Sequence, residues 1–166
     1  AIGWLMSKFS KLINGKKVLL LGPAPHVLDP DNTKDFEDFD VIVKVNKMVE
    51  KAEFKNDNLN NRTDILYHCM QIDIPNGDDP YSVEEWKNRG VKHVRMPFVG
   101  VEYHYKKNNN QFLKINSQFK IEYSFSSIET FSNACNMCDG TLPSTGILAI
   151  NDLIEQGPLL LSLIHI

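Results

Sequence analysis

Three short segments of this sequence are apolar almost throughout, with no alternation of apolar and polar residues. They are residues 18–21, 41–45 and 65–69. A strand with one face in water alternates apolar and polar side chains, whereas a strand covered on both faces is apolar along its length. The three segments therefore predict buried strands of a parallel sheet. Residues 91–96 are predicted as a fourth strand.

Helical patterns lie between and around these strands. Apolar residues recur at helical spacing in residues 4–13 and 147–154. Ser82 and Glu85 stand at capping-box spacing at the start of a short helix, and Gly90 follows it as a stop signal. Strands that alternate with helices predict an α/β fold, with an open, mostly parallel, Rossmann-like sheet flanked by helices.

One long region has little pattern. Residues 100–133 show no clear helical or strand period, and three consecutive asparagines at 108–110 predict the tip of a loop.

Composition excludes several classes of protein. The chain has 166 residues, of which 42% are hydrophobic and 23% charged, so a single domain with its own core is expected rather than a disordered chain. Its formal net charge of -3 makes a general nucleic-acid binder less favoured. No apolar run reaches the roughly 20 residues of a membrane-spanning helix.

Both ends of the sequence are unusual. The first residue is Ala1 rather than methionine, and residues 161–166 resemble a translated adapter from a sequencing library. We therefore expect one domain over residues 1–166 that is truncated at its C-terminus, with the last six residues artefactual.

Uncharged polar residues follow the first two predicted strands. Ligands of open parallel sheets bind at the carboxyl ends of the strands. There, Gly22 and His26 follow the first strand and Asn46 follows the second. Such groups suit hydrogen bonding to a nucleotide or a sugar better than a hard-metal site, which needs several carboxylates. Gly22 as a tight strand exit and Asn46 as a turn residue are the structural alternatives.

The glycine pattern after the first strand is not that of a dinucleotide-binding turn. Pro23 and Pro25 stand where the fingerprint needs glycines, and no Walker-type lysine follows. Binding of NAD in the usual manner is therefore disfavoured.

The start of the last predicted helix offers an anion site. Ser144 or Thr145 can cap this helix, and Gly146 has no side chain to block an approaching ligand. The first amides of a helix have no intrahelical partner and carry partial positive charge, so they suit a phosphate or carboxylate. An ordinary capped helix without a ligand is the alternative.

Cysteines and histidines give weaker signals. Cys135 and Cys138 are spaced like half of a zinc site, but no second pair accompanies them, so no metal is expected. Three cysteines cannot all pair within the chain, and a reducing compartment is the simpler interpretation. His68 is expected to be a core or wall residue, which makes His26 the better ligand contact.

Taken together, these segments resemble the animal-type sialyltransferases. Residues 17–22, 39–46 and 61–64 are similar to the large sialyl motif of that family. Residues 143–149 are similar to the start of the small sialyl motif, which is the more specific of the two. The order and separation of the motifs agree, and the resemblance covers most of residues 17–155.

This resemblance implies a glycosyltransferase that moves sialic acid or a related acidic sugar from a CMP-activated donor to a glycan hydroxyl, without a divalent metal. It implies that Asn46 contacts the donor nucleotide and that Ser144, Thr145 and Gly146 line the donor site. An asparagine in the family's first loop has no match here, and His26 stands in that loop instead.

Two departures from the family pattern qualify the implied function. No cysteine precedes Cys69, so the disulfide that joins the two motifs in the animal enzymes is not expected. This favours a bacterial or viral relative in the cytoplasm over an enzyme of the secretory lumen. The family's catalytic histidine belongs to a later motif, so the expected base lies beyond Ile166.

Two other readings remain open. One is a nucleotide-binding α/β domain without transferase activity. The other is an unrelated nucleotide-dependent α/β enzyme, such as an oxidoreductase or a hydrolase.

Overall fold

The computed structural model of the chain describes residues 6–22, 36–51, 60–70, 81–98 and 102–164. Side chains are described for all of these except residues 51, 102–105 and 164. In chain order the elements are α1 (Ser10–Ile13), β1 (Lys17–Leu21), the 3-10 turn η3 (Phe36–Asp38), β2 (Val41–Val45), α2 (Met48–Lys51), β3 (Thr63–Tyr67), α4 (Val83–Asn88), β4 (Val91–Met96), α5 (Glu102–Phe119), β5 (Glu122–Phe125), α6 (Ile128–Met137), α7 (Thr145–Glu155) and β6 (Leu160–Ile164).

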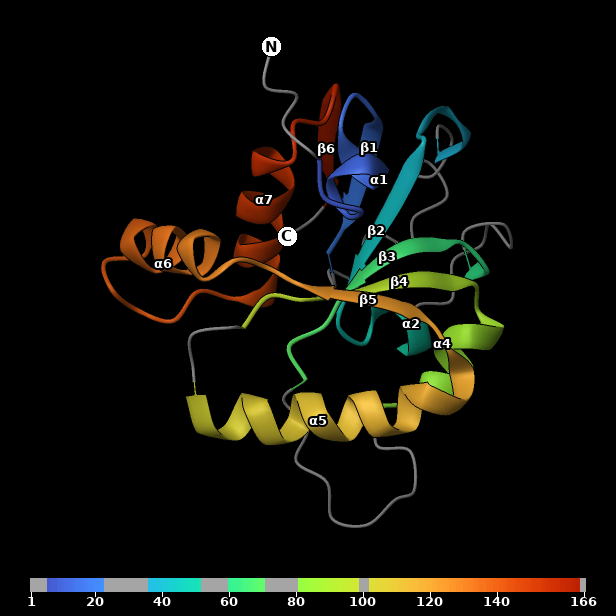
Figure 1. The fold of residues 1–166 in the computed structure, drawn as a ribbon. Helices are drawn as coiled ribbons and strands as arrows, with labels where there is room; N and C mark the ends of the chain where they lie inside the picture. Colours follow the sequence, from blue (N-terminus) through green and yellow to red (C-terminus); the bar gives the residue numbers. More distant parts are fainter. Residues whose placement is uncertain (1–5, 23–35, 52–59, 71–80, 99–101, 165–166) are drawn as a thin grey trace.

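The six strands form one sheet in the order β5-β4-β3-β2-β1-β6, and every neighbouring pair is parallel. The chain adds strands in one direction from β1 to β5 and then returns to the other side of β1 with β6 (Figure 1). The sheet therefore has a topological switch point between β1 and β6, which is where open α/β sheets usually leave a crevice for ligands. The predicted α/β class and parallel sheet are confirmed.

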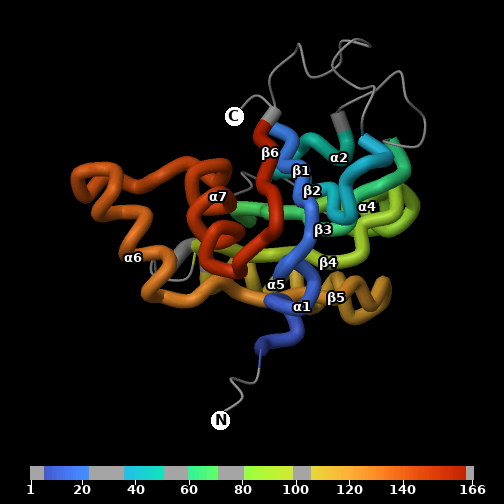
Figure 2. Tube along the Cα trace, turned by 90° about the horizontal axis from the view of Figure 1, so that it is seen from above, coloured from blue at the N-terminus to red at the C-terminus, as the bar shows by residue number. Residues whose placement is uncertain are grey.

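Both faces of the sheet are covered, as the apolar strands predicted. On one face, alternate residues of β1, β2 and β3 pack against α1 and α7, with Phe9, Ile13, Ala149 and Leu153 in the same core cluster. On the other face, Trp86 of α4 and Phe112 of α5 belong to a second cluster. Figures 1 and 2 show α6 and α7 together on one side of the sheet, while α2, α4 and α5 lie apart from them.

The strand predictions were accurate where the apolar runs were clean. β2 and β4 have the predicted bounds, and β1 begins one residue earlier than expected. β3 begins and ends two residues before the predicted 65–69. It ends there because the Cys69 N–H donates to the Asn46 side chain instead of continuing the ladder.

Two local predictions about helix starts were wrong. Of the predicted helix 4–13, residues 4 and 5 lie outside the described residues, and the helix begins only at Ser10. Its N-cap residue Phe9 makes no side-chain capping bond, and the Ser7 hydroxyl accepts from the Ser10 N–H in the turn before it. Ser82 occupies the N-cap position of α4, but its backbone is left-handed, with φ of 55°, and its side chain makes no capping bond. Glu85 forms an ion pair with Arg89 at 2.9 Å instead of completing a capping box.

The largest error concerns residues 100–133. The asparagines at 108–110 lie inside the 18-residue helix α5, not at a loop tip, and β5 and α6 follow in the same region. Asparagine is a poor helix former, but packing outweighs this preference. Phe112 is fully buried and stacks edge-on against Tyr81, whose hydroxyl donates to the Asn108 carbonyl.

The last helix agrees with the sequence, since α7 starts at Thr145 after the predicted cap. β6 (Leu160–Ile164) pairs in parallel with β1, so most of this strand falls within residues 161–166, the segment expected to be artefactual. Within the described part of the chain, no helix is long and apolar enough to cross a bilayer.

Candidate functional site

Asn46 closes β2 in an unusual backbone conformation. Its φ is 50°, in the left-handed region that asparagine enters more readily than most residues. Its backbone N–H donates to the Tyr67 carbonyl at 2.8 Å, which holds the end of β2 against the end of β3. The left-handed turn takes the chain out of the sheet at this point and leaves the asparagine side chain at the carboxyl edge.

The side chain of Asn46 connects three segments that are far apart in sequence. Its Nδ2 donates to the Thr145 hydroxyl oxygen at 3.2 Å, and its Oδ1 accepts from the Cys69 N–H at 3.0 Å. The strand exit at Asn46 and the start of α7 are therefore in direct contact. Two residues that the sequence assigned to one site, 99 positions apart, are hydrogen-bonded neighbours.

The start of α7 is ordered by its own cap. Ser144 is the N-cap residue, and its hydroxyl accepts from the Ile147 N–H at 3.4 Å. Thr145 and Gly146 are buried, whereas Ser144 is exposed. Because α7 runs antiparallel to the strands as a crossover helix, its N-terminus lies at their carboxyl ends, where its free amides create partial positive charge.

The exit of β3 also carries backbone strain. Met70 has φ of 54° although its side chain is fully buried, a conformation that costs a residue of this type of order 1–3 kcal/mol. Strained backbone of this kind is concentrated at functional sites. Two of the sheet's adjacent strand exits, at Asn46 and Met70, are therefore held in left-handed conformations.

His68 is a core residue, as the sequence indicated. It is buried, its ring lies 4.9 Å from that of Trp86, and its Nδ1 accepts the Met70 N–H at 3.0 Å. Burial, with a smaller contribution from the positive charge of Lys47, lowers the pKa of His68 from 6.5 to about 3. The ring is thus neutral at physiological pH and supports the β3 exit.

The remaining residues singled out in the sequence are Gly22, His26 and the three cysteines. Gly22 is buried at the end of β1, and the pairing of Leu21 with Lys44 brings this strand end close to the level of Asn46. His26 lies outside the described residues. Cys69, Cys135 and Cys138 are free thiols, and among the described residues no group of three or more histidines, cysteines or acidic residues is placed to hold a metal ion.

A buried polar cluster on the α7 side of the sheet was not predicted from the sequence. Arg95 of β4 makes a two-pronged ion pair with Asp152 of α7, with Nε–Oδ2 at 2.8 Å and Nη2–Oδ1 at 3.0 Å. The Tyr67 hydroxyl and the Ser126 hydroxyl donate to the same Asp152 carboxylate at 2.7 and 3.0 Å. Burial and the nearby carboxylate raise the pKa of Tyr67 well above its usual value.

This cluster continues toward the amino ends of the strands. Arg95 also donates to the Ser124 hydroxyl at 2.9 Å, and Ser124 is hydrogen-bonded to His93 Nε2 at 2.7 Å. The Arg95 guanidinium lies 3.9 Å from the centre of the Phe9 ring. One sequence signal could have revealed part of the cluster: Asp152 is a charged residue within the mostly apolar residues 147–154, and a buried charge needs a partner.

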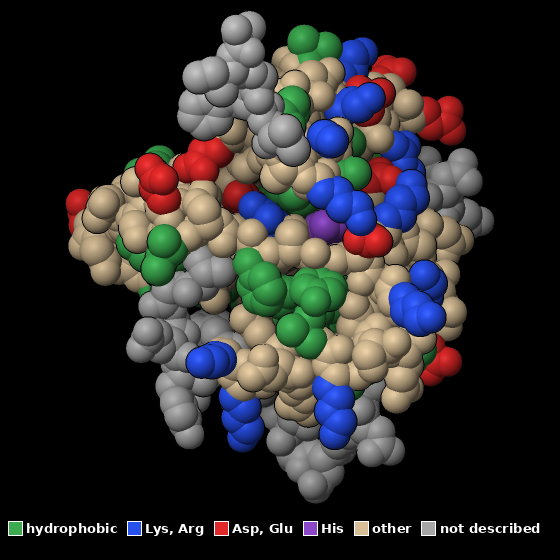
Figure 3. Space-filling view, in the orientation of Figure 1, with side chains coloured by type: hydrophobic (Ala, Val, Ile, Leu, Met, Phe, Trp, Pro, Cys, Tyr) green, Lys and Arg blue, Asp and Glu red, His purple; other side chains and the backbone are tan. Residues whose placement is uncertain are grey.

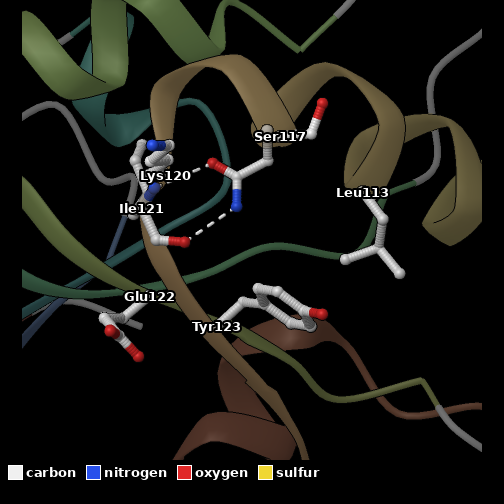
Figure 4. A pocket seen from close by; sticks show the side chains of 7 residues that line it. Leu113, Ser117, Lys120, Ile121, Glu122 and Tyr123 are labelled. Carbon is white, nitrogen blue, oxygen red and sulfur yellow. Dashed lines mark hydrogen bonds between the residues drawn. The ribbon is translucent and has the colours of Figure 1, made fainter.

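A shallow hollow between α5 and β5 lacks the features of a ligand site. It has a volume of about 310 Å³ and is lined by residues that include Leu113, Lys120 and Tyr123 (Figure 4). The Asn116 side chain uses both its amide groups on the backbone of Ile121, at 2.7 and 3.0 Å. These bonds fix the turn between α5 and β5 rather than leave polar groups for a ligand.

Comparison with known protein families finds no family that matches this chain. Comparison with curated proteins also finds no match. The assignment of a function therefore depends on the residues and their geometry.

Proposed function

We propose that this chain binds a CMP-activated acidic sugar, with sialic acid as the first candidate, and transfers it to a hydroxyl of a glycan acceptor. The proposed donor site is the carboxyl edge of the sheet at Gly22, Asn46 and the α7 start, Ser144, Thr145 and Gly146. The observation that carries the proposal is the hydrogen bond between Asn46 and Thr145. It joins the two segments that resemble the large and small sialyl motifs.

The chemistry of the donor fits the groups at this edge. A CMP-sugar of this class carries a phosphate and a sugar carboxylate, so two anionic groups must be held. The free amides at the start of α7 can hold one of them, as helix N-termini commonly do for phosphates. The Thr145 hydroxyl accepts from Asn46 and therefore keeps its own proton available to donate.

In the transfer step, the acceptor hydroxyl oxygen forms a bond to the anomeric carbon of the sugar. The bond from that carbon to the phosphate oxygen breaks, and CMP leaves with the electron pair. The α7 amides would stabilise the charge that develops on the departing phosphate. The hydroxyl proton passes to a general base, for which histidine is suited by its pKa near neutrality.

Neither of the two histidines whose side chains are described suits the role of base. His68 is buried and its Nδ1 accepts from a backbone amide. His93 lines a hollow at the opposite ends of the strands. We therefore expect the base to come from outside the described residues.

The same observations are compatible with a nucleotide-binding domain that has no transferase activity. The groups that meet at this edge, Asn46, Thr145 and the Cys69 amide, are uncharged and supply binding rather than proton transfer. Both readings predict CMP binding, and only the first predicts CMP release from the donor when a glycan is added. Preference for NAD or UDP over CMP would favour an unrelated nucleotide-dependent enzyme.

Calorimetric titration with CMP, cytidine, UDP and NAD tests the proposal. We expect CMP to bind best and Thr145→Val to weaken CMP binding at least about tenfold, since a lost hydrogen bond to a charged group is worth about 1.5–3 kcal/mol. Thr141→Val is the matched control, because the Thr141 hydroxyl is exposed and bonds only to the Cys138 carbonyl in the described structure.

Asn46→Asp gives a sharper test. Aspartate keeps the acceptor for the Cys69 amide but brings a negative charge to the edge, so it should weaken CMP binding while cytidine binding stays unchanged. If wild-type protein and both site variants bind CMP equally, or if CMP does not bind, this edge is not a donor site.

A further inference from the structure

We propose that a hollow at the amino ends of the strands is a second binding site, for a small organic acid with one negative charge and an apolar body. The hollow has a volume of about 500 Å³, within the range of small-molecule pockets. It is lined by α1 and by the first residues of β2, β3, β4 and β5. This inference does not depend on the proposed function.

The site is separate from the carboxyl edge. Val41 begins β2 and lines the hollow, whereas Asn46 follows the last residue of the same strand. A strand of this length spans about 16 Å. A ligand in the hollow therefore cannot touch the Asn46–Thr145 contact, and the two sites can be examined independently.

The floor of the hollow is apolar. Leu12 of α1, Val41 of β2 and Ile65 of β3 contribute aliphatic side chains. The His93 ring adds to this surface, and burial, with the positive charge of Arg95 next, lowers its pKa from 6.5 to about 4. His93 is therefore uncharged at neutral pH and adds no positive charge to the floor of the hollow. Such a surface favours an aliphatic or aromatic body.

The rim of the hollow favours one negative charge. Four lysines and three carboxylates line it, so the lining carries one net positive charge. Two of the lysines are neutralised, since Lys8 pairs with Glu122 at 2.8 Å and Lys92 pairs with Asp64 at 2.6 Å. Figure 3 shows basic and acidic side chains mixed around a histidine on this face.

The remaining carboxylate is also occupied. Asp40 Oδ2 accepts from the Lys17 backbone N–H at 2.8 Å. Lys11 and Lys16 are exposed and make no ion pair with any residue in the described ranges. These two ammonium groups are the available partners for an anion, while three nearby carboxylates would repel a polyphosphate. The rim thus selects a monoanion.

Decanoate is a suitable probe, because it joins one carboxylate to a nine-carbon alkyl chain. We would titrate it into isotopically labelled protein and follow the backbone amide signals of Val41, Ile65 and His93. Saturable shifts of these signals, with no shift at Asn46 or Thr145, are expected. Nonyltrimethylammonium, which has the same nine-carbon chain and the opposite charge, should bind at least about fivefold more weakly.

Charge-reversal variants test whether Lys11 and Lys16 bind the carboxylate of the probe. The double variant Lys11→Glu and Lys16→Glu should weaken decanoate binding about tenfold. Lys114→Glu on the outer face of α5 is the control and should leave it unchanged. Unaltered amide spectra away from the substitutions would show that each variant folds. Equal binding of the cation and the anion, equal binding by the double variant, or shifts confined to other residues would overturn the proposal.

Discussion

Replacing Asp152 with alanine tests the buried cluster that connects the last helix to the sheet. The Asp152 carboxylate accepts four hydrogen bonds of 3.0 Å or less, two from Arg95, one from Tyr67 and one from Ser126. The Arg95 side chain is only 8% exposed. Without Asp152 its charge has no counterion within this cluster, and removing one partner of a buried pair costs about 3–5 kcal/mol. That is a large part of the 5–15 kcal/mol that stabilises a typical domain.

A double-mutant cycle separates the charge from the packing. Arg95→Met should also destabilise the fold by about 3–5 kcal/mol, because it leaves a buried carboxylate without its cation. In the double variant Arg95→Met and Asp152→Leu no charge remains, so its cost should be at least about 2 kcal/mol below the sum of the single changes.

Urea unfolding followed by tryptophan fluorescence measures these costs, since Trp86 is fully buried in the native fold. The midpoint and the slope must both be recorded, because a changed slope would indicate a changed unfolded state. A loss below about 1 kcal/mol in Asp152→Ala, or costs that simply add in the double variant, would refute the account of a desolvated ion pair.

Three further changes have definite expected results in the same unfolding assay. Stability should fall as pH drops from about 6.5 toward 3, because the unfolded His68 ring takes up a proton that the buried ring does not. His68 alone can contribute a slope of up to about 1.4 kcal/mol per pH unit. His68→Gln should reduce this slope, and an unchanged slope would contradict the low pKa of His68. Gly90→Ala should destabilise the fold more than Gly140→Ala, although φ is 76° at both positions. A Cβ at Gly90 would lie 2.3 Å from the Asn61 carbonyl oxygen, whereas one at Gly140 meets nothing within 4 Å. Equal costs would show that the backbone around Gly90 moves aside. Phe112→Ala should cost about 3–5 kcal/mol if α5 depends on its buried aromatic contacts, and a cost below about 1 kcal/mol would contradict that explanation.

Local sequence signals predicted the sheet well because a buried parallel strand needs little context. Every residue of β2 is buried, so its apolar run marks its ends directly. The same holds for the cap of α7, where Ser144 accepts from the Ile147 amide as its position suggested. The α7 N-terminus at the carboxyl ends of the strands followed from the crossover geometry.

Context decided the features that could not be predicted. The helix α5 forms over three asparagines because Phe112 and its neighbours pack on the sheet, and no local preference contains that information. The pairing of Arg95 with Asp152 joins residues 57 positions apart, so it depends on strand order and helix placement. At Ser82 the pattern of a capping box was present, but the left-handed backbone directed the side chain elsewhere.

The polar contacts of α7 also explain how the candidate site keeps its geometry. Apolar packing through Leu153 and its neighbours holds the helix on the sheet, but such contacts are not directional and resist sliding along the helix axis only weakly. Hydrogen bonds supply the direction. The helix is tied to the exit of β2 at Thr145, to β4 at Asp152, and to α1 through Gln156, whose Oε1 accepts from the Ser10 hydroxyl at 2.6 Å.

These hydrogen bonds are distributed along the whole length of α7. Because they fix the position of α7 relative to the strand ends, the first amides of the helix keep a fixed place at the carboxyl edge. The Asn46 side chain therefore serves a structural purpose whether or not a ligand binds, since it positions the groups that would hold one. A turn residue and the proposed binding residue are therefore not competing descriptions of Asn46. In the proposed donor site, the first role would be the physical condition for the second.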